Sequence, residues 1–256
     1  MKNNFPYFTD RTQQDIDIIS QEKQKFHKNN FENTNMLLDK IDFVFQKHLS
    51  FLNFARHNER HYDSLIYTAL HKNFYIIYSA NDLLKKGLYG SSLVLLRQSF
   101  EFLMISKFCA ISKDYNLYNQ WENGKHINMK NLILNKIKKP NVEKLNDFWK
   151  YLCNVNHSSI YSQQVDLIWK NQIDSINSTF IYIRILLEWH YHLLNSIYLT
   201  KKIKYYFEYY DDKNIMKKCK LDITNLFKLT KKNYSKEAKS LVWIYKASWE
   251  ITPNKY

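Results

Sequence analysis

The scarcity of turn-forming residues constrains this chain more than any other feature of its sequence. Its 256 residues include only three glycines and three prolines. All-β proteins and strand-rich α/β proteins need many such residues, because glycine and proline set the backbone angles of tight turns. The sequence therefore predicts an all-α fold, a single up-and-down helical bundle with peripheral C-terminal helices.

Apolar residues recur at spacings of three and four in several segments, which is typical of amphipathic helices. The break between the second and third segments falls at "KKGLYGS", where Gly87 suits the position just after a helix end. The segment after residue 172 is apolar on most faces, so we expect it to be central. The predicted helices are approximately 32–54, 62–86, 89–112, 142–156, 173–201, 214–231 and 235–249. A weaker helix is predicted over 127–139, where Pro140 stops it, and a loop over 158–172.

The chain shows no internal repeat and no glycine- or proline-rich linker, so we expect one domain. Residues 1–30 are polar and predict a loosely docked N-terminal arm. Residues 31–205 are predicted to form the bundle core. Residues 206–256 are rich in lysine and aromatic residues and are expected to pack on that core as helices.

The net charge of +14 favours a polyanionic partner such as RNA, because lysine and arginine neutralise phosphates. Thirty-three of the 38 basic residues are lysine, a bias that AT-rich codons would also produce. The three cysteines lie far apart without metal-ligand spacing, so no disulfide, metal or cofactor is expected and a reducing cytoplasm fits best. The chain has no secretory signal and no apolar run long enough to cross a bilayer, which argues against a membrane partner.

Two arginine–glutamate pairs at a spacing of four stand out inside apolar segments: Arg97 with Glu101, and Arg184 with Glu188. Residues four apart share one helix face, and pairing makes the burial of a charge tolerable. The simplest interpretation of each is a structural ion pair that fixes helix register. The alternative is that the two pairs converge with His157 in the bundle as a site for an anion or a phosphate.

The order of "LLRQSFEF", "YNLYNQWENG" and a helix ending "LCNVNHSS" resembles the bacterial helical proteins of the DUF5677 and AbiV-like type, which are related in outline to the HEPN superfamily. The resemblance covers roughly residues 65–200. It implies a helical bundle, often paired as a homodimer, in a superfamily rich in phage-defence and toxin proteins. An abundance of aromatic residues also favours a homodimer, because aromatic side chains are common at interfaces.

Many HEPN proteins are metal-independent ribonucleases with an arginine followed, after four to six residues, by a histidine. The histidine can accept the 2′-hydroxyl proton and the arginine can stabilise the charged phosphorane. Here Lys150, Asn154 and Asn156 precede His157, so that arginine is missing there, whereas Arg56 with His61 and Arg184 with His190 match the spacing. A core histidine satisfied by a neighbour is the commoner explanation for His190.

Two functions follow as expectations. The first is a HEPN-like defence effector of the abortive-infection or toxin type, acting as a metal-independent endoribonuclease. The second is a non-catalytic helical sensor, adaptor or antitoxin that binds a protein partner from a defence operon. The candidate catalytic residues are His157, Arg97, Glu101, Arg184, His61 and Arg56.

Overall fold

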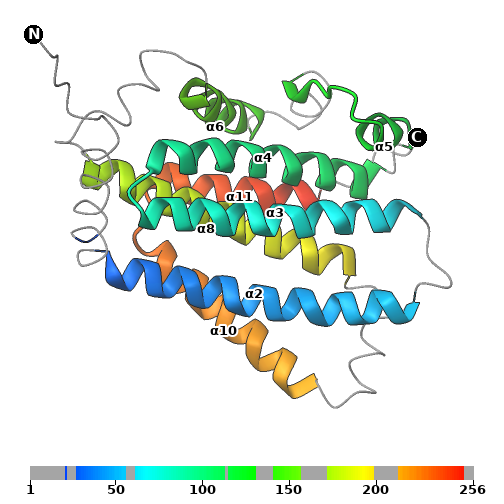
Figure 1. Ribbon diagram of the computed structural model, residues 1–256, viewed down its shortest axis with the longest axis horizontal. Helices are drawn as coiled ribbons and strands as arrows, with labels where there is room; N and C mark the ends of the chain where they lie inside the picture. The colour runs from blue at the N-terminus through cyan, green and yellow to red at the C-terminus, as the bar shows by residue number, and fades with distance from the viewer. Residues whose placement is uncertain are drawn as a thin grey trace, which may run out of the picture.

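The computed structural model describes residues 21, 27–55, 61–112, 115–130, 141–156, 172–198 and 213–250. Within these ranges the regular structure is helical and contains no strand, which confirms the predicted all-α class (Figure 1). The helices are α2 (Lys28–Ala55), α3 (His61–Lys85), α4 (Tyr89–Ser112), α5 (Tyr115–Glu122), α6 (Asn141–Asn156), α8 (Gln172–Tyr198), α10 (Lys213–Lys231) and α11 (Lys236–Glu250).

The α3–α4 hairpin turns at Gly87, as the sequence predicts. Gly87 adopts a φ of 79°, in the left-handed region where a side chain would be strained. The amide of Leu88 donates to the carbonyl of Leu83 at 2.9 Å, and the amide of Gly87 donates to the carbonyl of Leu84 at 3.1 Å. These two bonds satisfy carbonyls that the end of α3 would otherwise leave unpaired, so the helix stops there and α4 returns along it.

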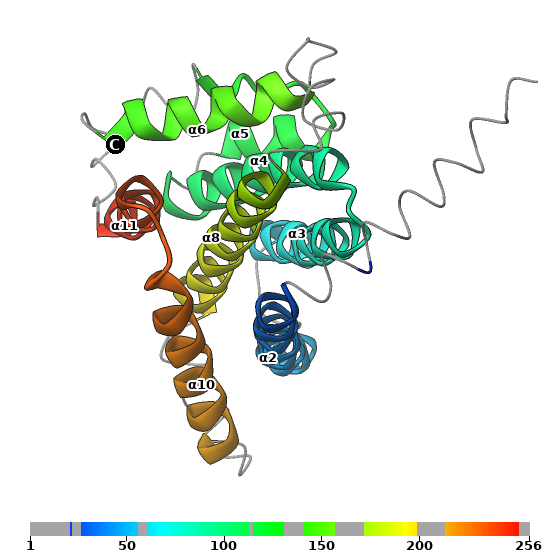
Figure 2. The same cartoon turned by 90° about the vertical axis from the view of Figure 1, so that its left-hand side faces the viewer.

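Helix α8 is central, as its apolar sequence predicts. It crosses the α3–α4 hairpin and also packs against α2 and α11 (Figure 2). Residues 183–190 are all buried. Trp189 stacks on Tyr245 of α11 with ring centroids 4.4 Å apart and an interplanar angle of 9°, and it also packs against Phe100 of α4. This aromatic contact joins α4, α8 and α11 into one core.

The remaining helices cover this centre from several sides. α6 lies on α4, and α2 runs along α3 and contacts α8 (Figure 1). α10 lies against α2, where Lys40 Nζ and Asp222 Oδ2 are 2.8 Å apart, and it continues past the bundle (Figure 2). α11 contacts both α8 and α6. The C-terminal helices therefore pack on the core, and the fully buried Tyr245 makes α11 a part of it.

Two details differ from the sequence-based expectations. His27 lies inside the predicted arm of residues 1–30 but belongs to the packed fold, because it is buried against the ring of Phe180 with centroids 5.7 Å apart. Helix α5 was not predicted, because it has only eight residues and an apolar pattern over so short a segment is weak. It ends at Glu122, and the chain turns at Gly124, whose φ is 67°.

The weaker helix predicted over 127–139 and the loop predicted over 158–172 lie almost wholly outside the described residues. Among the helices that the structure does describe, none combines the length and the apolar character that a membrane span requires.

Candidate functional site

Arg97 and Glu101 form the predicted ion pair on α4. Arg97 Nη2 and Glu101 Oε1 are 3.1 Å apart, and the two side chains are 26% and 31% exposed. The Arg97 guanidinium also lies over the ring of Trp149 on α6, with 5.1 Å between Cζ and the ring centroid. The pair therefore sits in the seam between α4 and α6, where it is held on two sides and still reaches solvent.

The surroundings of this pair change the acidity of two groups. Burial raises the pKa of Glu101, although Arg97 and His126 favour its ionised form. Burial likewise raises the pKa of the Cys153 thiol on α6, and the neighbouring Arg97 opposes that rise. Arg97 Nε is buried and has no hydrogen-bond partner among the described residues. The seam thus fixes a guanidinium that is partly exposed to solvent, although its Nε is not.

Arg184 does not form the pair with Glu188 that the spacing predicts. Its guanidinium points to α2, where Nη2 donates to both the carbonyl oxygen and Oδ1 of Asn30 at 3.1 Å, and Nε donates to Thr34 Oγ1 at 3.3 Å. The residue is only 3% exposed. The prediction was wrong because α2 offers three oxygen acceptors to Arg184, and other cations already surround Glu188.

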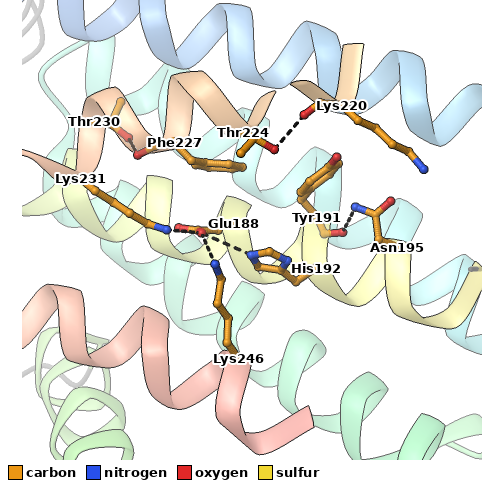
Figure 3. Close-up of polar contacts among 10 residues, drawn as sticks. All are labelled: Glu188, Tyr191, His192, Asn195, Lys220, Thr224, Phe227, Thr230, Lys231 and Lys246. Atoms are coloured by element: carbon orange, nitrogen blue, oxygen red, sulfur yellow. Dashed lines mark hydrogen bonds and ion pairs between the residues drawn. The ribbon is translucent and has the colours of Figure 1, made fainter. Parts of the chain in front are cut away.

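Glu188 is the centre of a cluster that joins three helices (Figure 3). Its Oε1 accepts from Lys231 of α10, lies 3.4 Å from Lys246 Nζ of α11, and lies 3.3 Å from Nε2 of His192. Burial would raise the pKa of Glu188, but the hydrogen bonds from His192 and Lys231, together with their charge, outweigh it and lower the pKa. Oε2 is buried without a partner among the described residues.

The predicted convergence of the two arginine–glutamate pairs in one interior cluster is not what the structure shows. Arg97 faces α6, and Arg184 faces α2. Among the described residues, Arg97 contacts Glu101 and Trp149, whereas Arg184 contacts Asn30, Thr34 and Phe180. Between α8 and α11, Trp189 stacks on Tyr245.

Two further polar side chains are buried in the core. Asn73 Nδ2 and His190 Nδ1 are 3.2 Å apart, so His190 is a core histidine with one neighbour, while its Nε2 is buried without a partner among the described residues. Burial lowers the pKa of His190 to about 3. Lys107 of α4 was missed from sequence: it is 4% exposed, and its Nζ donates to the carbonyl of Tyr245 at 3.0 Å and lies 4.2 Å from the centroid of that ring.

The other predicted site residues cannot be placed. Arg56 and His157 lie outside the described residues, and His61 begins α3 with a side chain that is also outside them. Lys231 and Lys246, which complete the Glu188 cluster, were missed because nothing in a lysine-rich amphipathic pattern marks which lysines turn inward.

Within the described part of the chain, no group of three histidine, cysteine, aspartate or glutamate side chains is arranged to hold a metal ion. Comparison of the chain with protein-family models, curated proteins and solved structures found no match. The class that fold and site define is thus an all-α bundle with two separate charged clusters, and the resemblance to HEPN-like defence proteins stays a prediction.

Proposed function

We propose that the protein is a HEPN-like defence effector that cleaves RNA without a metal at the α4–α6 seam. The observation that carries this proposal is the difference between the two described arginines. Arg184 is buried and its donors are occupied by α2, whereas the Arg97 side chain is 26% exposed. Arg97 is therefore the one of the two that can contact a phosphate group, and Arg is suited to that contact by its planar fork of donors.

The register of α6 supports His157 as the partner of Arg97. Trp149 and Cys153, which Arg97 approaches, are four residues apart on α6. His157 follows Cys153 by four residues in the sequence, one position after the last residue of α6. Residues at this spacing share a helix face. The spacing in the sequence is thus what supports His157 as the partner of Arg97.

In this mechanism His157 accepts the proton of a ribose 2′-hydroxyl, and the oxygen attacks the adjacent phosphorus. The bond from phosphorus to the 5′-oxygen breaks, that oxygen takes a proton from water, and a 2′,3′-cyclic phosphate remains. Arg97 stabilises the extra negative charge of the phosphorane, held in place by Glu101 and by the ring of Trp149.

The test is incubation of the purified chain with total RNA and tRNA in EDTA. We expect cleavage with cyclic phosphate ends. His157→Ala should lower the rate by about 1,000-fold through loss of the base, and Arg97→Lys by about 100-fold through loss of bidentate charge stabilisation. His61→Ala is the matched histidine control for the competing Arg56–His61 motif. No cleavage, or cleavage that survives both His157→Ala and Arg97→Lys, would contradict the proposal.

A second function, a non-catalytic module that binds a protein partner, is supported by the outer face of α10. Ile215, Leu221 and Leu229 are 55%, 59% and 51% exposed. At 100° per residue they fall within an arc of about 120°. In cells that express the protein, a growth effect that persists in His157→Ala but is lost when these three residues become serine would favour this function over ribonuclease activity.

The homodimer belongs to the same proposal, because two HEPN-type protomers often share one site. Light scattering of the dilute protein measures it directly. A molar mass near 31.2 kDa, the mass of one chain, would contradict dimerisation.

A further inference from the structure

Helix α11 has one aromatic side chain on its solvent face, and lysines surround it. Trp243 is 62% exposed, more than any other large apolar side chain described. Lys236, Lys239 and Lys246 are also exposed and lie seven and four residues before it and three after it. At 100° per residue these four side chains fall within an arc of about 80° on the helix surface. We call them the α11 stripe.

The inner face of α11 explains why Trp243 cannot be a misplaced core residue. The buried residues on that helix include Ala238, Leu241, Val242 and Tyr245, and Trp243 points to the opposite side. Tyr245 already fills the core by stacking on Trp189. Exposing a tryptophan forgoes burial that contributes roughly 2–3 kcal/mol for a large apolar side chain, so the position has no packing explanation among the described residues.

The α11 stripe is built on a rigid support. Ser235 Oγ accepts from the amide of Ala238 at 3.2 Å and caps the start of the helix. Near the other end, Lys246 lies 3.4 Å from the buried carboxylate of Glu188, which limits the space that its side chain explores. Together with the buried Tyr245, these contacts fix the helix before any ligand arrives, which lowers the entropic cost of binding.

The two C-terminal helices, α10 and α11, carry a surplus of positive charge. Residues 213–250 contain ten lysines and three acidic residues, a surplus of seven, which is half of the net charge of +14 in 38 of the 256 residues. A surface of this kind attracts polyanions through release of their counterions. A π-face among phosphate-binding cations is what binders of single-stranded nucleic acid use, since each base can stack on it whatever its identity.

We propose that the α11 stripe binds single-stranded nucleic acid, with a base stacked on Trp243 and phosphates neutralised by Lys236, Lys239 and Lys246. A membrane surface is a poorer occupant, because a helix that lies in a bilayer needs a broad apolar face and this stripe has one apolar side chain. The inference rests on the proposed function for the choice of RNA and names its substrate class, but binding does not require the cleavage site.

The experiment uses the full-length chain carrying His157→Ala, so that cleavage does not obscure binding. Fluorescence anisotropy of a labelled 12-nucleotide oligo(U), in EDTA, measures the affinity. Trp243→Ala should weaken binding by about 10-fold, as expected for the loss of one stacked base, and Trp243→Phe should restore most of it. An RNA duplex of the same length should bind less tightly than the single strand, because its bases are already stacked.

Charge provides an independent arm with a matched control. The double variant Lys236→Gln/Lys239→Gln should reduce the slope of log affinity against log salt by about 1.4, since each phosphate contact on a single strand contributes about 0.7. Lys217→Gln/Lys218→Gln removes the same charge from exposed positions of α10 and should change the slope less. Lys246 is left unchanged because of its contact with Glu188.

Several results would overturn the inference: no binding of oligo(U), an affinity that Trp243→Ala leaves unchanged, or equal effects of the two lysine pairs. Binding to vesicles of phosphatidylserine and phosphatidylcholine that depends on Trp243, without binding of oligo(U), would assign the stripe to a membrane surface instead. The two proposals fail separately. If the wild-type chain binds oligo(U) but cleaves no RNA, only the proposed ribonuclease activity is contradicted. If Trp243→Ala changes neither cleavage nor binding, only the proposed role of the α11 stripe is contradicted.

Discussion

Helices α4 and α8 each carry an arginine followed four residues later by a glutamate, and the two pairs behave differently. On α4 the partners meet each other at 3.1 Å and are about one quarter to one third exposed. On α8 they separate: Arg184 turns to α2, and Glu188 gathers Lys231 and Lys246 from α10 and α11. Both α8 side chains are no more than 3% exposed.

The difference shows that a spacing of four on a helix permits an ion pair but does not ensure that it forms. The outcome depends on what the neighbouring helices offer. α8 is surrounded by other helices, and a buried charge there gains more from partners fixed on those helices than from one flexible partner on its own. α4 meets α6, whose contribution to Arg97 is the face of Trp149, so Glu101 remains its carboxylate. The α8 pair therefore ties helices together, and the α4 pair stays accessible for chemistry.

The largest expected contrast is in stability. Arg184→Met should lower the free energy of unfolding by about 3 kcal/mol, because it removes three hydrogen bonds that a buried, charged donor makes to Asn30 and Thr34. Arg97→Met should cost less than about 1 kcal/mol, the usual range for a pair that solvent reaches. Urea denaturation monitored by circular dichroism measures both midpoints.

A control for charge loss alone is Lys86→Met, which removes the partner of Asp82 in a pair with side chains 58% and 47% exposed. We expect little change there. Equal midpoint shifts for Arg184→Met and Arg97→Met would contradict the conclusion that the α8 pair joins helices and that the α4 pair contributes little to stability. An unchanged slope of free energy against urea would confirm that the shifts report stability.

The fold was largely readable from the sequence, because helix boundaries follow local chemistry. The shortage of glycine and proline excluded sheets, apolar periodicity gave the long helices, and Gly87 marked the α3–α4 turn. The predictions failed for a short helix and for a residue whose packing partner is distant in the sequence. Helix α5 spans too few residues for a clear period, and the burial of His27 depends on Phe180, more than 150 positions away.

The site was predicted less well, for a physical reason. Arg97 with Glu101 is a local contact within one helix, so sequence alone could identify it. The partners of Glu188 come from helices 43 and 58 residues further along, and their lysines resemble their exposed neighbours. Lys107 did carry a signal, a single cation inside "FLMISKFCA", but only the structure shows the Tyr245 carbonyl that accepts its hydrogen bond.

The interior character of α8 can be tested a second way, through pH. The pKa of His190 lies near 3 in the folded protein, against 6.5 for an ordinary histidine, because burial disfavours the charged form. The unfolded chain therefore binds a proton that the folded chain does not, and this group makes stability fall as pH drops from about 6.5 toward 3. Between pH 6 and 4.5 the loss from His190 alone should be about 2 kcal/mol.

His190→Gln keeps an amide that can bond to Asn73 and removes the titration. Unfolding free energies of the wild type and this variant, measured from pH 8 to 4.5, should run parallel above pH 7 and diverge below about 6.5, with the variant losing less. A constant separation over the whole range would mean that His190 binds a proton as readily in the folded chain as in the unfolded chain, and would contradict the lowered pKa.

The smallest expected effect concerns Glu188 and Glu101, whose contributions to stability should change with pH in opposite directions. The pKa of Glu188 is lowered, so its contribution to stability is present above about pH 4.5, the ordinary glutamate value, and is lost as pH falls through the folded value. The pKa of Glu101 is raised by burial, so its contribution is present below about pH 4.5 and is lost as pH rises through the folded value.

Glu188→Gln should therefore destabilise the protein by about 1 kcal/mol at pH 7 relative to its effect at pH 3.5, through loss of charge-assisted hydrogen bonds. Glu101→Gln should change in the opposite direction, by less. Thermal unfolding of both variants against the wild type at the two pH values measures these differences, and equal signs would show that both carboxylates share one environment, despite their different neighbours.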